Sequence, residues 1–483
     1  MDRADDDGFL DGLNPGQQRA WWLREALAAD PGAPCPPLAD HASADVVVLG
    51  GGYTGLWSAY FLTERAPGAR VLILDQDICG GGPSGRNGGF VTAWWDELPA
   101  MVAMWGEERA LATARAVSDS VTAIGEWCGR HGVDAWFRHA GYLQVSAAPA
   151  QDDAWRRAAA LCRELGVVDE YAELSPAEVQ ARCASPVFRA GVLMRAGATV
   201  QPARLARGLR RVLLERGVTI YEGTHVTRIR PGAAGSPVRV ETVGGEVTAE
   251  RAIVGLNAWS AGWPWFRRSL VAWSSYMVLT EPIPERLAEL GWTGGEAIID
   301  SRVALHYFRT TPDGRIAFGG GGGRAGYDGR IGGSFTEDTV AVRDVAEGMR
   351  RLFPSLGDAR IVDAWGGPID VAADHLPFYG TLPGGRVSYG MGYSGNGVAP
   401  SHLGGQILAA LALGLDDETA RLPLVGRLPN RFPPEPLRYI GARLVREAIL
   451  RRDRALERGR SAGPVVDFVA AVPRWMGYRI GVE

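Results

Sequence analysis

Three glycines in the pattern Gly50-x-Gly52-x-x-Gly55 have the spacing that could hold the pyrophosphate of a dinucleotide. They come directly after the apolar residues 45–49, which are typical of a buried parallel strand. Gly50 would allow a tight turn, Gly52 the close approach of the phosphates, and Gly55 the packing of a following helix. A second apolar run ends at Asp75, 20 residues past Gly55, where a carboxylate can bind the hydroxyls of an adenosine ribose.

Two further glycine-rich segments favour FAD over NAD as the dinucleotide. Residues 80–89 follow the second strand directly, where a nicotinamide dehydrogenase needs no such loop but a buried flavin and its ribityl chain would lie. Residues 392–398 lead into a helix whose N–H groups can face the negative charge near N1 of a reduced flavin. The residues that we expect to bind the cofactor are Gly50, Gly52, Tyr53, Thr54, Gly55, Asp75, Gln76, Ser84, Gly85, Arg86, Asn87, Gly88, Gly89, Val226, Asn257, Gly392, Tyr393, Ser394, Gly395, Asn396, Gly397 and Val398.

The composition excludes several kinds of chemistry. All 51 basic residues are arginine, so the chain has no lysine for a Schiff base, for a phosphate-binding P-loop or for general base catalysis. A formal net charge of -4 gives no basic excess for binding nucleic acid. The five cysteines form no C-x-x-C pair, and the chain has neither an apolar signal segment nor a long apolar run. We therefore expect a soluble cytoplasmic protein without a transmembrane segment or a metal site.

The pattern of strands and helices predicts an α/β fold in which a Rossmann-like FAD-binding domain is interleaved with an α+β substrate domain built on an antiparallel sheet. Buried apolar runs between helices indicate the parallel sheet, and alternating residues between 274 and 320 indicate the antiparallel one. We expect helices at residues 14–29, 56–63, 101–117, 118–131, 154–165, 176–183, 202–216, 397–413 and 437–458. The expected domains are an N-terminal helix and linker (1–40), the FAD-binding domain (41–134, 196–262 and 356–430), the substrate domain (135–195 and 263–355) and a C-terminal helical extension (431–483).

The antiparallel sheet should form a roof over the flavin, and its candidate catalytic residues are Tyr276, His306, Tyr307 and Arg309. Alternation along residues 304–309 places Tyr307 and Arg309 on one face and His306 on the other. We expect the first two to meet the substrate, because a guanidinium can hold a carboxylate while a phenol orients the amine. A turn at residues 312–314 should pair this strand with the next one. An aromatic box for a cationic amine could be built from Trp94, Trp95, Trp259, Trp263, Trp265 and Trp273.

Taken together, these motifs resemble the D-amino-acid oxidase family of flavoproteins, and most of all its gamma-glutamylputrescine oxidase branch. The resemblance spans residues 14–425, and it is carried by residues 45–56, 84–89, 313–320 and 392–397, by Trp365-Gly366-Gly367 and by Asp374-His375-Leu376-Pro377. It implies FAD, a two-domain fold and oxidation of an amine or amino acid. Some relatives tether the flavin through a histidine of the second glycine loop, but no histidine stands between Asp75 and Val91.

The reaction that the resemblance implies is oxidation of a C–N bond in a small amine or amino-acid-like substrate. Hydride transfer to flavin N5 would give an imine, which water hydrolyses. The electron acceptor could be O2 or another molecule, because the chain lacks the lysine with which some relatives activate oxygen. Two alternatives also stay open. One is a flavin-dependent monooxygenase. The other is a membrane-associated flavoprotein electron carrier, which would contact the lipid surface through the basic C-terminal helix with Arg443, Arg446, Arg451, Arg452 and Arg454.

Overall fold

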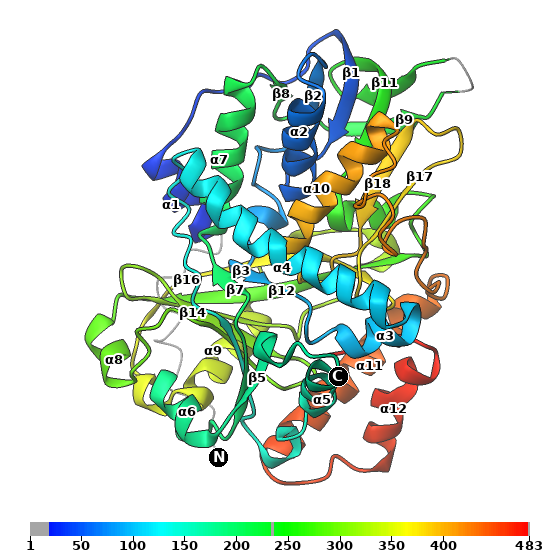
Figure 1. The fold of residues 1–483 in the computed structure, drawn as a ribbon. Helices are drawn as coiled ribbons and strands as arrows, with labels where there is room; N and C mark the ends of the chain where they lie inside the picture. The colour runs from blue at the N-terminus through cyan, green and yellow to red at the C-terminus, as the bar shows by residue number, and fades with distance from the viewer. Residues whose placement is uncertain (1–18, 233–235, 482–483) are drawn as a thin grey trace.

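The apolar residues of β1 (His41–Leu49) lie in the middle of an eight-stranded sheet in the computed structural model, which describes residues 19–232 and 236–481 (Figure 1). β1 pairs in parallel with β2 (Val71–Leu74) and with β11 (Glu246–Val254). The order of strands is β17-β18-β11-β1-β2-β8, and β10 and β9 extend the sheet from β11. The other strands are β8 (Thr219–Tyr221), β9 (Val226–Arg230), β10 (Val238–Thr242), β17 (Phe378–Thr381) and β18 (Val387–Met391).

Both faces of this first sheet are covered, which explains why its central strands are apolar without interruption. Val46 and Val48 face a core shared with α2, α4, α7 and α10, whereas Val47 and Leu49 face the segment Asn257–Gly262. The helices of the described chain are α1 (Trp21–Ala29), α2 (Tyr53–Arg65), α3 (Leu98–Trp105), α4 (Glu107–Arg130), α5 (Arg156–Glu164), α6 (Pro176–Arg182), α7 (Pro202–Glu215), α8 (Pro284–Glu289), α9 (Thr339–Leu352), α10 (Val398–Leu413), α11 (Leu437–Glu457) and α12 (Pro464–Trp475).

A second sheet of eight strands has the order β16-β12-β15-β14-β13-β4-β6-β5. Its strand pairs are antiparallel except for β4 with β13. The predicted hairpin is confirmed, because β14 and β15 pair with His306 opposite Gly320 and Thr310 opposite Ile316. The strands are β4 (Tyr142–Val145), β5 (Tyr171–Leu174), β6 (Gly191–Met194), β12 (Leu270–Thr280), β13 (Ala297–Asp300), β14 (His306–Thr310), β15 (Ile316–Gly320) and β16 (Ile361–Ala372).

The chain passes back and forth between the two sheets, which confirms the interleaved α/β architecture expected from the sequence. β1 and β2 belong to the first sheet, β4 to β6 to the second, β8 to β11 to the first, β12 to β16 to the second, and β17 and β18 to the first. Between the sheets lies a short antiparallel pair, β3 (Phe90–Thr92) and β7 (Gly197–Thr199). The exact domain boundaries stay a prediction.

The prediction of a helix boundary between residues 117 and 118 is wrong, because α4 is continuous there. The break lies instead at Gly106, between α3 and α4, where the backbone φ angle is 80°. Only glycine adopts this conformation readily, so Gly106 separates the two helices. The predicted helix start at residues 14–15 lies outside the described residues, and α1 begins at Trp21.

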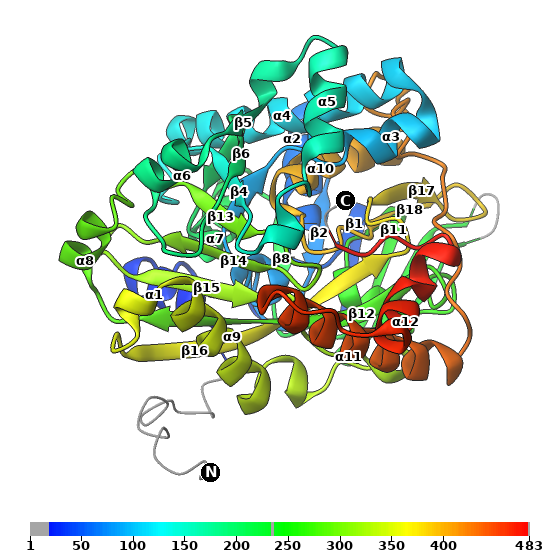
Figure 2. The same ribbon diagram turned by 90° about the horizontal axis from the view of Figure 1, so that it is seen from below.

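The C-terminal extension contains two helices rather than the single one predicted. α11 and α12 pack on each other, and in Figure 2 they lie together, in red and orange-red, on the side of the second sheet where α9 is found. Within residues 19–232 and 236–481, no helix combines the length and the apolar character needed to cross a membrane.

Candidate active site

A cavity of about 560 Å³ lies where the two sheets and the C-terminal extension meet. Of the predicted cofactor residues, those that line it are Tyr53, Thr54, Ser84, Arg86, Asn87, Gly88, Asn257, Tyr393, Ser394, Gly395, Asn396, Gly397 and Val398. The others lie outside its lining: Gly50, Gly52, Gly55, Asp75, Gln76, Gly85, Gly89, Val226 and Gly392. The structure therefore brings parts of all three glycine motifs to one cavity.

Hydrogen bonds join the three motifs directly. The Tyr53 backbone N–H donates to the Ser84 hydroxyl over 2.8 Å, which ties the start of α2 to the second glycine segment. The Thr54 hydroxyl donates to the Tyr393 hydroxyl over 3.0 Å, which ties α2 to the segment before α10. These contacts connect parts of the chain that are far apart in sequence. The three motifs therefore form one hydrogen-bonded wall of the cavity.

The glycines of the first motif are required by backbone geometry. Gly50 has a φ angle of 104°, and a Cβ atom there would lie 2.5 Å from the Gly255 carbonyl oxygen. A Cβ atom on Gly55 would lie 1.9 Å from the Gly50 carbonyl oxygen, so a side chain would push α2 away from the turn. The roles expected for these two glycines, a tight turn and close helix packing, agree with this geometry.

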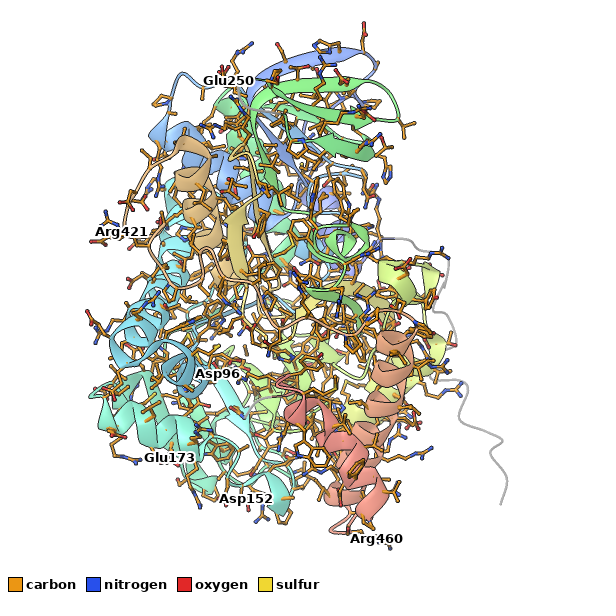
Figure 3. All side chains as sticks on the ribbon, turned by 90° about the vertical axis from the view of Figure 1, so that its right-hand side faces the viewer. Asp96, Asp152, Glu173, Glu250, Arg421 and Arg460 are labelled. Atoms are coloured by element: carbon orange, nitrogen blue, oxygen red, sulfur yellow. The ribbon has the colours of Figure 1, made fainter. Side chains whose placement is uncertain are left out.

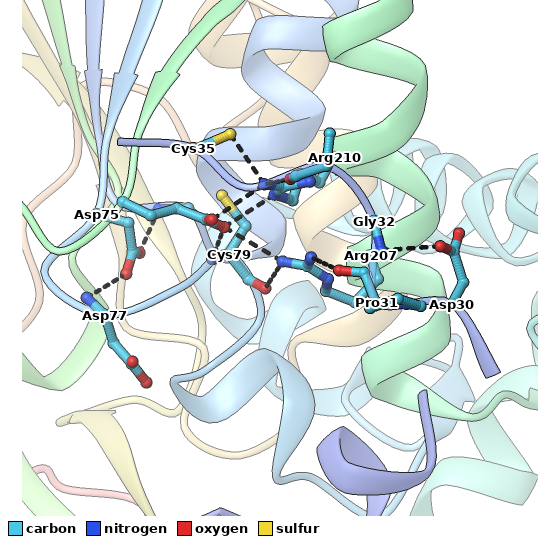
Figure 4. Close-up of polar contacts among 12 residues, drawn as sticks. Asp30, Pro31, Gly32, Cys35, Asp75, Asp77, Cys79, Arg207 and Arg210 are labelled. Carbon is cyan, nitrogen blue, oxygen red and sulfur yellow. Dashed lines mark hydrogen bonds and ion pairs between the residues drawn. The ribbon is translucent and has the colours of Figure 1, made fainter. Parts of the chain in front are cut away.

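Asp75 sits at the end of β2 and holds two neighbouring backbone segments (Figure 4). Its carboxylate accepts hydrogen bonds from the backbone N–H groups of Gly51 over 2.7 Å and Asp77 over 2.8 Å. Burial raises the pKa of Asp75 to about 6. The exposed Gln76 beside it meets His225, which directly precedes Val226 and β9, with 3.2 Å between the Gln76 Oε1 and His225 Nδ1 atoms. The predicted residues Asp75, Gln76 and Val226 thus lie near one another, beside the C-terminal end of β2.

A buried ion-pair group supports the loop after Asp75, as Figure 4 shows. The Arg210 Nε donates to the Glu222 carboxylate over 2.9 Å, and the same carboxylate accepts from the Cys79 backbone N–H over 2.8 Å. Arg207 adds a second guanidinium, 3.2 Å from Glu222. Because α7 carries both arginines, this helix positions the start of the second glycine segment.

Asn257 carries an unpaired polar atom into the cavity wall. Its Nδ2 donates to the Asp370 carboxylate over 2.8 Å, while its buried Oδ1 has no hydrogen-bond partner in the described part of the chain. The Asp370 carboxylate also accepts from the Gly392 N–H over 2.5 Å, and burial raises its pKa to about 7. Buried carbonyl oxygens are almost always paired, so this atom is available to a hydrogen-bond donor from water or from a bound molecule.

The four predicted catalytic residues do not lie together. Tyr307 lines the cavity, and its hydroxyl lies 2.8 Å from the Ser275 hydroxyl. His306 and Tyr276 are on the opposite face of the sheet and line a different cavity beside α9. The His306 Nδ1 lies 2.6 Å from the Asp300 carboxylate, and burial lowers the pKa of this histidine. We therefore propose no catalytic role for His306 or Tyr276.

Arg309 shares the face of Tyr307, as the alternation predicts, but its guanidinium lies outside the cavity lining. It is buried and donates to the carbonyl oxygens of Gly89 over 3.3 Å and Val200 over 2.5 Å. Burial lowers the pKa of Arg309 to about 9. These partners are backbone groups beside the second glycine segment, so the arrangement fits an arginine that positions this segment better than one that holds a substrate.

Sequence reasoning missed two carboxylates at the cavity, Asp96 and Glu97. Asp96, labelled in Figure 3, follows β3 and is only 7% exposed. Burial raises its pKa to about 7, since the charged form is costly there, and the neighbouring Glu97 charge adds to this effect. Glu97 pairs with Arg479 of the extension. No motif marks these two residues, and only the fold reveals that they line the same cavity as the glycine motifs.

Of the six tryptophans considered for an aromatic box, Trp273 lines the cavity and the other five do not. Trp95 is buried and donates from its indole nitrogen to the Ser118 hydroxyl over 2.9 Å, as a core residue does. An aromatic box is therefore not supported. Among the described residues no cluster of three or more potential metal ligands occurs.

The comparisons with known proteins agree with this site. Residues 45–411 match the protein-family model described as FAD dependent oxidoreductase. The chain therefore belongs to the D-amino-acid oxidase family, and it is an FAD-dependent oxidoreductase. Among its relatives, the probable oxidoreductase OrdL of Rhizobium meliloti (strain 1021) is 31% identical over 422 residues, which are 84% of this chain and 90% of OrdL.

One further relative is similar in sequence, and one solved structure is similar in fold. The gamma-glutamylputrescine oxidoreductase of Escherichia coli (strain K12) is 28% identical over 414 residues, 84% of this chain and 91% of its own. Glycine oxidase from Geobacillus kaustophilus superposes with a TM-score of 0.63 at 20% identity, over 80% of this chain and 99% of that enzyme. The latter similarity shows a common fold.

Proposed function

We propose that the protein oxidises a C–N bond of a small amine or amino-acid-like substrate, with FAD held by the three glycine motifs. The start of α2 and the carboxylate of Asp75 would hold the adenosine and pyrophosphate parts. Residues 84–89, Asn257 and the start of α10 would surround the flavin. The unpaired Asn257 Oδ1 supports this assignment, as does the start of α10, where the N-cap residue Gly397 supplies no side chain to cap the first N–H groups. At the start of α2 the Tyr53 N–H already donates to the Ser84 hydroxyl, and the N-cap residue Gly52 supplies no side chain to the N–H groups that follow.

The observation that carries the proposal is the carboxyl of Asp96 in the same cavity as the flavin motifs. A substrate amine is cationic near neutral pH, and a buried cavity can accept this charge only beside an anion. Asp96 would supply that anion when ionised. With its pKa near 7, it could also take the ammonium proton, leaving the neutral amine that oxidation requires.

Tyr307 would orient the substrate from the roof of the cavity. Its ring lies between Phe90 and Gly319, and a Cβ atom on Gly319 would come 2.1 Å from the ring. This packing fixes the ring, while the Ser275 hydroxyl holds the phenol group. Burial raises the pKa of Tyr307 to about 12, so the phenol stays protonated. The Ser275 hydroxyl donates to the Gly320 carbonyl oxygen over 2.9 Å, so the Tyr307 O–H donates to Ser275, and a lone pair of the phenol oxygen would accept a hydrogen bond from the substrate N–H.

The reaction balances without a further protein group. When bound, FAD supplies the acceptor for the hydride that leaves the substrate carbon. The neutral amine then becomes an iminium ion, to which water adds, and the products are a carbonyl compound and ammonia or an amine. The cavity walls would exclude bulk water from the first step, which strengthens the electrostatic contact with Asp96.

The two alternatives have less support. A monooxygenase would need a site for a nicotinamide reductant, and we recognise none among the residues that the structure describes. Four of the five arginines of α11 considered for lipid binding have polar partners: Arg446 donates to Gly322, Arg451 lies near Glu447, Arg452 near Asp467 and Arg454 near Asp344. The fifth, Arg443, lies over the Tyr439 ring. Because these arginines are engaged within the protein, we do not propose a membrane-associated carrier.

An anaerobic substrate screen tests the proposal. Purified protein should contain FAD that acid precipitation releases, and amines should bleach its oxidised flavin absorbance. The panel should include linear primary amines, N-methyl amino acids, gamma-glutamyl amines, polyamines and aminophosphonates, with the matching alcohols as controls. We expect one carbonyl product for each flavin reduced. Bleaching by alcohols but by no amine, or by NADPH alone, would contradict the proposal.

A further inference from the structure

One side of the active-site cavity is built by the C-terminal extension, residues 431–481. The family model ends at residue 411, so this wall is an addition to the matched family region. α11 and α12 lie against each other (Figure 2). Both helices and the segment after them bring apolar side chains to the cavity. The apolar lining residues of the extension include Leu437, Val445, Ile449, Val472, Met476 and Ile480.

Polar contacts of α11 anchor the extension to the loop before β14. The Ala304 backbone N–H donates to the Asp453 carboxylate over 2.9 Å. Glu457 lies 3.2 Å from the Arg302 guanidinium. Asp453 is 4% exposed, so its carboxylate is fully enclosed between α11 and the loop before β14. Because that loop also lines the cavity, the anchor fixes the distance between two of the cavity's walls.

Two arginines of α11 line the cavity, and both guanidinium groups are bound to other groups of the protein. Arg446 donates to the Gly322 carbonyl oxygen over 2.7 Å. Arg438 is buried, donates to the Leu270 carbonyl oxygen over 3.1 Å and forms an ion pair with Glu435. Their guanidinium groups are therefore engaged by the protein, and the surface that α11 adds to the cavity is mainly apolar.

The mouth of the cavity is apolar as well. Leu437 and Met476 belong to the lining, yet they are 64% and 47% exposed, so they form the rim. Further inside, Ile449 is only 8% exposed and packs with Val445 and Ile480. An apolar surface thus runs from the rim into the cavity, as expected where an apolar group enters and stays bound.

We propose that this wall is a specificity site for an apolar substituent of the substrate, an inference that rests on the proposed amine oxidation. The ammonium group would lie beside Asp96, and an alkyl or aryl group would lie along α11 and α12. The substrate class is then a hydrophobic amine or an N-alkylated or hydrophobic amino acid, rather than one with a second charged end.

Ligand binding can be measured apart from turnover. Amines with two methyl groups on the nitrogen-bearing carbon have no hydrogen there, so they can bind but cannot lose a hydride. A series of these amines with chains from propyl to octyl would be titrated into the FAD-loaded protein, with the flavin absorbance spectrum as the readout. We expect binding to tighten about two- to four-fold for each added methylene until the wall is filled.

Two neighbouring residues of α11 give matched variants. Val445 lines the cavity, whereas Leu444 is 61% exposed and does not. V445S should weaken binding of the octyl amine several-fold, with little change for the propyl amine, and L444S should leave both unchanged. Equal FAD occupancy and equal melting temperatures would show that both variants are folded.

The outcomes separate this inference from the proposed function. If no amine binds or reduces the flavin, both are overturned. If amines bind and reduce the flavin but chain length has no effect, or if V445S and L444S behave alike, the specificity wall is overturned and the amine oxidation stands. If amines with a terminal carboxylate bind more tightly than the plain alkyl amines, the inference that this wall binds an apolar substituent is also overturned.

Discussion

The Thr54 hydroxyl donates a hydrogen bond to the Tyr393 hydroxyl over 3.0 Å, across 339 positions of the sequence. It links the first turn of α2 to the segment before α10, and both residues line the cavity. A direct hydrogen bond therefore connects the segment proposed to bind the pyrophosphate with the segment proposed to bind the flavin.

Removing this contact tests the coupling. Y393F would leave the buried Thr54 hydroxyl without its partner and should lower the free energy of unfolding by about 1 kcal/mol. We also expect weaker retention of FAD on dialysis. Y389F is the control, since Tyr389 is a buried tyrosine of β18 whose hydroxyl bonds to none of the described residues. Equal FAD retention in the two variants would show that the Thr54–Tyr393 bond does not support the site.

Asp75→Ala should weaken FAD binding by about 1–3 kcal/mol, because it removes the acceptor of two backbone N–H groups and the proposed partner of the ribose. Titration of apoprotein with FAD, followed by flavin fluorescence, gives the affinity. Asp77→Ala changes an exposed carboxylate two residues further on and should leave the affinity nearly unchanged. Similar losses in the two variants would remove Asp75 from the cofactor site.

Arg309→Met distinguishes a positioning role from substrate binding. The variant leaves the Val200 carbonyl oxygen without its side-chain donor, whereas the Gly89 carbonyl oxygen keeps the Val200 N–H as a donor. We expect a loss of about 1–3 kcal/mol in stability. KM values for anionic and uncharged substrates should change by the same factor. Arg315→Met, which alters a guanidinium that binds Asp313 near the hairpin turn, is the control. A rise in KM confined to anionic substrates would instead show that Arg309 binds the substrate.

Asp96 should give the reaction a dependence on pH. Burial places its pKa at about 7, so the carboxyl is neutral below this pH and cannot attract an ammonium ion. The value of kcat/KM for amines should therefore rise as the pH increases through about 7. Asp96→Asn should remove this rise and increase KM by roughly ten-fold or more, the expected loss of a hydrogen bond to a charged group.

The control for this profile is Glu107→Gln, which changes an exposed carboxylate in the first turn of α4. It should keep the pH profile of the unaltered protein. An unchanged profile in Asp96→Asn would assign the titration to another group and would leave the ammonium without the partner proposed for it.

The glycine turns of the proposed cofactor site are the feature that the sequence alone predicts most directly. The glycines at positions 50 and 55 have a local reason, since turn geometry and close packing exclude a side chain there. Their spacing, with an apolar strand before them and Asp75 after them, is readable without knowledge of the fold. The alternation that places Tyr307 and Arg309 on one face is equally local.

The remaining features depend on contacts between distant segments. Asp96 has no motif, and its position at the cavity follows from the packing of β3 between the two sheets. The direction of the Arg309 guanidinium depends on carbonyl groups more than 100 positions away. The place of the extension is set by Asp453 and Glu457 meeting the loop before β14, which the amphipathic pattern of α11 alone does not reveal.

The central claim is that a C–H bond next to nitrogen is broken as the flavin is reduced. Stopped-flow mixing of the FAD-loaded protein with a reactive amine, without oxygen, measures that step directly. We predict that replacing the hydrogens on the nitrogen-bearing carbon by deuterium slows loss of the oxidised flavin absorbance several-fold, and that the same labelled carbon appears in the carbonyl product. Equal rates for the two isotopic substrates, together with the absence of a carbonyl product, would contradict C–N bond oxidation.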